Sequence, residues 1–158
     1  MPGDGRAERD AGPRRAGDSR RPHLNRRLLP AVAIGGAAGG AARAAIGLAW
    51  PTGHGQFPWA ILISNVLGSL LIGAFLELAV LRQPQHAHWR ALATTGFCGG
   101  FTTWSTFMVG TDELLAGHRP ALAFGYLALS VVAGLAAVVA GAGVTARFIG
   151  AQVAGGEP

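Results

Sequence analysis

Residues 121–146 read ALAFGYLALSVVAGLAAVVAGAGVTA, a run that contains no charged side chain. An α-helix needs about 20 consecutive apolar residues to cross the hydrocarbon core of a bilayer, and this run is longer than that. A helix at the surface of a soluble protein would carry a polar face, which this run lacks. The sequence therefore predicts a transmembrane helix over about residues 121–147.

Three further apolar stretches precede this run, at about residues 28–50, 59–81 and 91–115. The connections between them are short, so neighbouring helices are expected to run antiparallel. Charged residues make up only 13% of the chain, whereas soluble domains carry about 25%. We therefore predict an all-α integral membrane protein whose domain, residues 28–148, has four transmembrane helices.

The two ends of the chain differ from this apolar body. Residues 1–27 hold eight of the 13 basic residues and almost no large apolar side chain. Such a composition buries too little surface to offset the entropy of ordering, and it predicts disorder. The net charge of +5 describes mainly this tail, so we do not interpret it as a nucleic-acid-binding surface. Residues 149–158 are predicted to form a short C-terminal tail.

Arginine is distributed unequally between the two sides of the predicted membrane domain. The N-terminal tail, the 82–90 connection and the C-terminal end share one side and hold eleven Arg, whereas the other side has only Arg119. An excess of Arg and Lys in short loops and tails marks the cytoplasmic side. We expect a multi-pass protein of the cell membrane with both termini in the cytoplasm.

Polar groups and glycines within the first two stretches indicate packing or ion contact. Residues 35–43, GGAAGGAAR, contain two overlapping GxxxG spacings, which let helix backbones approach closely. Arg43 ends this row, and two roles stay open for it: an anchor for carbonyl groups, or a charge that attracts anions to a pore mouth. Asn65 in the second stretch either bridges helices or offers its amide to a passing ion.

The third stretch contains TGFCGGFTTWSTF at residues 95–107. A Gly-Gly pair followed by β-branched Thr disfavours an uninterrupted helix. Irregular backbone at membrane depth is tolerated only where protein buries it or where it lines a wet cavity. Trp104 and Phe107 would share one face of the helix that resumes, and their positive ring edges suit an anion. Four hydroxyls lie in the same short segment: Thr102, Thr103, Ser105 and Thr106.

Together, GGAAGGAAR, SNVLGSLLIG and TGFCGGFTTWSTF resemble the Fluc (CrcB) family of fluoride channels in motif and order. The resemblance covers about residues 30–147. It implies four helices per subunit, with the third broken at mid-membrane. It also implies an antiparallel dimer with two fluoride pores and a structural sodium ion at the dimer interface.

The resemblance assigns roles to individual residues. The backbone carbonyls of Gly99 and Thr102 would hold the sodium ion, and Arg43 would lie near the vestibule. Asn65 would hydrogen-bond fluoride. The remaining pore positions that it implies are Trp104, Phe107, Thr106, Ser105, Thr103, Tyr126 and Ser130.

Two positions depart from the family pattern. Trp104 stands where the family usually has Phe, and an indole is bulkier and carries its own N–H donor. Gly134 stands one turn after Ser130, where the family usually has a second Ser. The polar track of the fourth helix is therefore expected to be shortened at Gly134.

The function expected from these features is a fluoride-specific channel that lowers cytoplasmic fluoride by passive efflux. The sequence has no nucleotide motif, catalytic triad or paired carboxylates, so we expect no enzyme activity. Two alternatives stay open: a small four-helix proton-coupled multidrug exporter, and a non-transporting membrane scaffold. Besides fluoride and membrane lipid, the expected partner is an antiparallel subunit. The arginine bias favours an oppositely oriented paralogue over a second copy.

Overall fold

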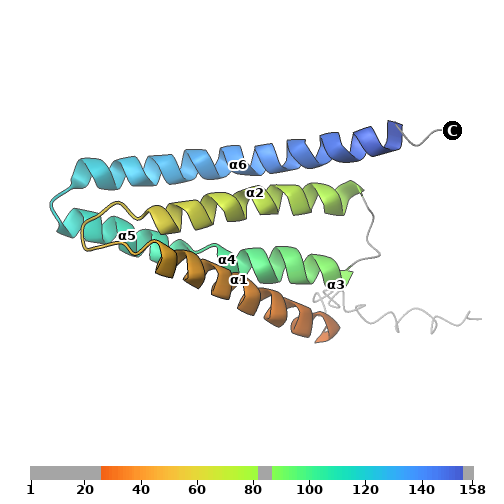
Figure 1. Cartoon of the computed structure of the whole chain (residues 1–158), viewed down its shortest axis with the longest axis horizontal. Coiled ribbons are helices and arrows are strands. Elements are labelled where there is room, and N and C mark those ends of the chain that lie inside the picture. Colours follow the sequence, from red (N-terminus) through yellow and green to blue (C-terminus); the bar gives the residue numbers. More distant parts are fainter. Residues whose placement is uncertain (1–25, 82–86, 155–158) are drawn as a thin grey trace, which may run out of the picture.

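The computed structural model describes residues 26–81 and 87–154, and all regular structure in these two ranges is helical (Figure 1). A 3-10 turn, η1 (Arg26–Leu28), leads into the first helix. Three helices are long and apolar enough to cross a membrane. They are α1 (Leu29–Ala49), α2 (Trp59–Leu81) and α6 (Pro120–Ala154).

The stretch that the sequence predicted as one span over residues 91–115 consists of several pieces. They are α3 (Ala87–Arg90), the π-helix η3 (Ala91–Cys98), α4 (Gly99–Phe101) and α5 (Trp104–Ala116). Thr102 and Thr103 are extended between α4 and α5. A single uninterrupted helix is therefore absent from this part of the described chain, because the Gly-Gly pair and the two β-branched Thr disfavour it.

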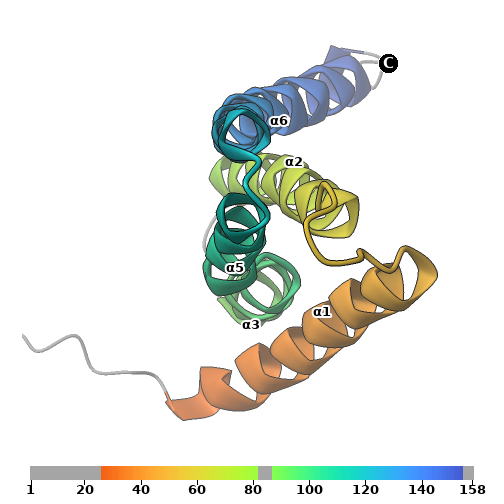
Figure 2. The same cartoon turned by 90° about the vertical axis from the view of Figure 1, so that its left-hand side faces the viewer.

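The helices run alternately in opposite directions, as the short connections predicted (Figure 1). Seen from the end, α6 and α2 lie side by side, the segment from α3 to α5 lies beyond α2, and α1 forms the far side (Figure 2). The most extensive contacts join α2 to α6 and α1 to η3 and α4. The beginning of α1 and the end of α6 lie at the same end of the bundle (Figure 1).

Glycines set the spacing within both of these helix pairs. A Cβ on Gly35 or Gly39 of α1 would collide with the carbonyl oxygens of Leu92 and Phe97. In the other pair, a Cβ on Gly73 of α2 would collide with the carbonyl oxygen of Val138. The close approach predicted from the GxxxG spacing is thus confirmed at residues 35 and 39, whereas Gly40 faces open space.

The boundaries agree with the predicted spans for α1 and α2 and differ for α6. Helix α6 continues to Ala154, beyond the predicted end of the fourth span at residue 147. Its 35 residues extend over about 52 Å, more than the roughly 30 Å of a hydrocarbon core. Most of the predicted N-terminal tail, residues 1–25, lies outside the described residues, as does 155–158.

The outer surface of the bundle is strongly apolar. Large hydrophobic side chains such as Leu48, Val80 and Val139 are almost fully exposed. Soluble monomers rarely expose large contiguous apolar surface, so this surface fits contact with lipid or with another subunit.

Candidate anion pathway

The interruption between α4 and α5 is the centre of the candidate site. Thr102 has φ −84° and ψ 155°, and Thr103 has φ −149° and ψ 124°. Thr103 caps the new helix, because its hydroxyl accepts a hydrogen bond from the Thr106 N–H at 3.2 Å. The hydroxyls of Ser105 and Thr106 lie 3.3 and 3.0 Å from the same Thr103 oxygen. Three of the four predicted hydroxyls therefore form one cluster at the start of α5.

Asn65 of α2 binds the interrupted backbone with both ends of its amide. The Thr103 N–H donates to Asn65 Oδ1 at 2.9 Å, and Asn65 Nδ2 donates to the Thr103 carbonyl at 3.1 Å. These two bonds satisfy backbone groups that have left the helical pattern. Of the two roles that the sequence left open for Asn65, the bridging role is confirmed. An amide NH2 has two donors, so one N–H is not used by Thr103.

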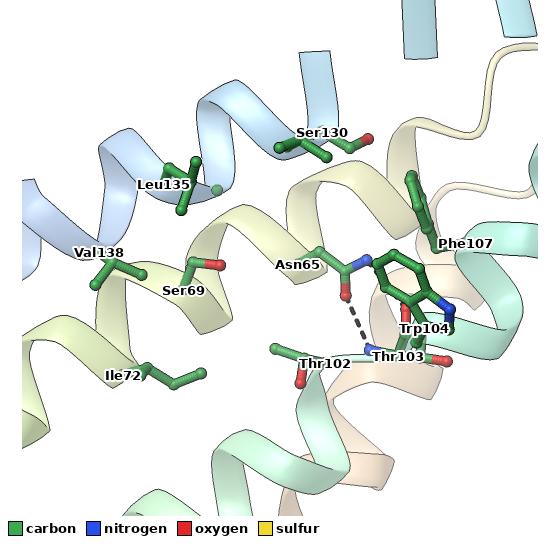
Figure 3. Close-up of a pocket in the computed structure, with 12 residues that line it drawn as sticks. Asn65, Ser69, Ile72, Thr102, Thr103, Trp104, Phe107, Ser130, Leu135 and Val138 are labelled. Carbon is green, nitrogen blue, oxygen red and sulfur yellow. Dashed lines mark hydrogen bonds between the residues drawn. The ribbon is translucent and has the colours of Figure 1, made fainter. Parts of the chain in front are cut away.

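A cavity of about 370 Å³ lies beside this amide, between α2, α6 and the interruption (Figure 3). It brings together predicted residues that come from three separate segments of the chain. The predicted residues that line it are Asn65, Thr102, Thr103, Trp104, Phe107 and Ser130. Gly134, the departure on α6, also lines the cavity, and so does Ser69, which was not among the predicted site residues.

The two aromatic residues of α5 differ strongly in exposure. Phe107 is 3% exposed and Trp104 is 72% exposed, with their ring centroids 5.2 Å apart. The prediction that they share one face is confirmed. Because Trp104 lies largely at the surface of the subunit, one side of the cavity is open there.

Two hydroxyls on α6 are buried without a hydrogen-bond partner in the described part of the chain. They are the Tyr126 OH and the Ser130 Oγ. Leaving a buried hydroxyl unsatisfied costs about 1–3 kcal/mol. Tyr126 is not a lining residue of the cavity, but its ring lies 5.1 Å from that of Phe107. The two hydroxyls are four residues apart and close enough to interact with each other, but neither makes a well-formed hydrogen bond to the described residues.

Arg43 lines a second, smaller cavity of about 160 Å³ on the α1 side of the interruption. Its Nε donates to the Gly100 carbonyl at 3.2 Å, which confirms the anchoring role. Its other N–H groups make no hydrogen bond to the described residues. Thr103 and Thr106 line this cavity too, whereas Ser105 lines neither. The predicted pore residues that line a cavity therefore divide between two cavities, and Thr103 borders both, whereas Ser105 and Tyr126 line neither.

The interruption also changes the environment of the two carbonyls predicted to hold a cation. In a continuous helix, the Gly99 carbonyl would accept from the Thr103 N–H, but that group donates to Asn65. The Thr106 N–H likewise donates to the Thr103 hydroxyl and not to the Thr102 carbonyl four residues before it. Gly99 is exposed, and a Cβ there would meet no atom within 4 Å. The interruption thus deprives both carbonyl oxygens of the N–H donors that a continuous helix would give them.

The family model and the similar proteins that match this chain all indicate the same family. The family described as CrcB-like protein, Camphor Resistance (CrcB), matches residues 30–142. A protein of Streptomyces avermitilis named fluoride-specific ion channel FluC 3 is 44% identical over 118 residues, which is 74% of this chain and 57% of that protein. FluC 1 of Mycolicibacterium paratuberculosis is 42% identical over 112 residues, covering 71% and 85%. FluC 2 of Nocardia farcinica is 38% identical over 133 residues, covering 84% and 95%.

Proposed function

Because this chain belongs to the CrcB family, we propose that it is a subunit of a fluoride-specific ion channel in the cell membrane. In acidic surroundings fluoride enters cells as membrane-permeant HF, which dissociates in the less acidic cytoplasm. An anion-selective pore then lowers cytoplasmic fluoride by passive efflux, without an energy source.

The observation that carries this proposal is the cavity beside Asn65. It combines an amide donor, the buried ring of Phe107 and the buried hydroxyl of Ser130. Donors without acceptors to occupy them favour a small, strongly hydrogen-bonding anion. Apolar walls from α6 exclude water, and because fluoride is more strongly hydrated than chloride, the protein donors must replace the hydration that it loses.

The two alternative functions lack comparable support. A small four-helix proton-coupled exporter needs a carboxylate in its first membrane helix, and α1 contains no Asp or Glu. A non-transporting scaffold explains the glycine rows, but it gives no reason for buried donors that lack partners.

Fluoride permeation with rejection of chloride is the first expected result. Proteoliposomes that contain the purified dimer, with the paralogous subunit co-expressed where the chain does not dimerise alone, should release fluoride at least about 100-fold faster than chloride, a difference of about 2.8 kcal/mol in barrier height. Ion-selective electrodes measure both effluxes after a potassium ionophore is added. Protein-free liposomes loaded with the same salts are the control. Equal rates for the two anions would contradict the proposed function.

For the assembly, the proposal is an antiparallel dimer of four-helix subunits. The segment from α3 to α5 lies alongside the three long helices, which supports a role as the fourth span (Figure 1). The open side of the cavity at Trp104 supports a second subunit, because a lipid-exposed opening would not confine an ion.

A structural sodium ion at the dimer interface is part of the same proposal. The carbonyls of Gly99 and Thr102 would hold it, since the interruption removes their helical donors. Such an ion would balance the partial negative charge of carbonyls that face each other across the interface.

We also place both termini in the cytoplasm and pair this subunit with an oppositely oriented paralogue. The beginning of α1 and the end of α6 lie at the same end of the bundle, which supports a common side for both termini (Figure 1). A subunit that inserts in either direction should have nearly balanced arginine counts. A homodimer remains the competing assembly if the arginine-rich tail orients the chain weakly.

Labelling from outside intact cells tests this orientation. The buried Cys98 is first replaced by Ala, and single cysteines then replace His54 and His88, exposed residues at opposite ends of the bundle. When the chain is expressed alone, a membrane-impermeant thiol reagent should label position 54 at least about tenfold more than position 88. Permeabilised cells supply the control for total reactivity. Equal labelling would show dual insertion and remove the reason for a paralogous partner.

A further inference from the structure

The polar track on α6 ends early in this chain. Tyr126 and Ser130 are four residues apart and lie on one face of the helix, and the next position on that face is Gly134. Gly134 lines the cavity but contributes no side chain. Farther along, the lining residues Ile72, Leu135 and Val138 are apolar. Among the α6 residues that line the cavity, Ser130 is therefore the last one with a hydroxyl.

A hydroxyl from the neighbouring helix lies in the space that Gly134 leaves. A Cβ on Gly134 would be 3.4 Å from the Ser69 Oγ of α2. Both residues line the 370 Å³ cavity, and Figure 3 shows the Ser69 oxygen directed along it toward Asn65. Ser69 follows Asn65 by four residues, so both side chains lie on the same face of α2.

The Ser69 hydroxyl is also chemically available. Hydroxyls on membrane helices commonly donate to the carbonyl four residues before them. Ser64 donates in this way to Ala60 at 2.8 Å, and Thr111 donates to Phe107 at 3.1 Å. Ser69 makes no hydrogen bond to any described residue. Its proton is therefore free for an ion in the cavity.

We propose that Ser69 continues the anion path across the gap at Gly134, so that the track passes from α6 to α2. This inference rests on the proposed channel function. The Ser69 hydroxyl donates to fluoride beside Gly134, the position at which α6 offers no side chain. Because Gly134 has no side chain, there is room for the ion. The donor that the family usually has on α6 at this position is therefore supplied by α2 in this chain.

The test removes the hydroxyl and then returns it from the opposite helix. Ser69→Ala should lower fluoride efflux from proteoliposomes by about tenfold, the effect of losing one hydrogen bond to a charged group. Adding Gly134→Ser to Ser69→Ala should restore efflux to within about threefold of the unsubstituted channel. A role of Ser69 in packing alone would not be rescued in this way. Thr111→Val is the matched control, because it removes a hydroxyl bonded to Phe107 outside the cavity.

The possible outcomes separate this inference from the proposed function. If the unsubstituted channel releases no fluoride, the channel function itself fails. If it conducts and Ser69→Ala conducts equally well, only the role of Ser69 fails. Should Ser69→Ala not assemble, Ser69→Cys keeps the size of the side chain and weakens the donor. An unchanged fluoride rate in Ser69→Cys, or no rescue by Gly134→Ser in a folded double variant, overturns the inference.

Discussion

Asn65→Asp should abolish fluoride transport, with efflux from proteoliposomes reduced at least about 100-fold. One carboxylate oxygen can still accept from the Thr103 N–H, as Oδ1 does now at 2.9 Å. The other replaces the amide nitrogen that donates to the Thr103 carbonyl at 3.1 Å, so two oxygens would repel each other there. The carboxylate also adds a negative charge to a cavity proposed to hold an anion.

Asn65→Ala separates charge from the loss of the two hydrogen bonds. It removes both bonds to Thr103 but adds no charge. We expect this variant to conduct faster than Asn65→Asp, although more slowly than the unsubstituted channel. Size-exclusion elution of both variants reports whether they assemble. Efflux at the original rate in Asn65→Asp would mean that Asn65 does not border the ion path.

Replacing sodium by a large organic cation should weaken both the dimer and the flux. An ion present at a concentration of about 100 times its Kd stabilises the state that binds it by about 2.7 kcal/mol. Its removal should therefore lower the thermal transition of the detergent-solubilised dimer by several degrees. The measurement compares sodium with N-methylglucamine at constant ionic strength.

Thr102→Val is the control for this experiment. It removes the Thr102 hydroxyl, which donates to the Cys98 carbonyl at 2.9 Å, but it keeps the Thr102 carbonyl. If carbonyls hold the ion, this variant retains the sodium dependence. A dimer whose stability and flux are the same in both cations would contradict the sodium proposal.

The helices could be predicted from the sequence because membrane spans depend on local composition. Residues 59–81 were predicted as a span, and α2 has these bounds. The interruption after Gly99-Gly100 was also predictable, because two glycines and two Thr are locally unfavourable in a helix. The π-helix η3 was not, since a wider helical turn leaves little trace in residue type.

The residues of the site could be predicted from the sequence more easily than the contacts between them. Asn65 and Thr103 are 38 residues apart in sequence, and nothing local indicates that the amide binds that backbone. The pairing of Ser69 with Gly134 depends on the register between α2 and α6, which the glycine contacts of Gly73 determine. The four-residue spacing from Asn65 to Ser69 was the one local signal of a shared face.

The glycine contacts also determine how the chain can evolve. Any substitution at Gly35, Gly39 or Gly73 adds a Cβ that collides with a carbonyl oxygen of the opposite helix, so drift is blocked there whatever the channel carries. Gly99 has no such constraint, because nothing lies within 4 Å of its missing Cβ. Among related sequences, invariance at Gly35, Gly39 and Gly73 would be explained by packing within one subunit. If Gly99 were invariant as well, the cause would have to be a contact outside the subunit, because no atom within the subunit restricts a Cβ there.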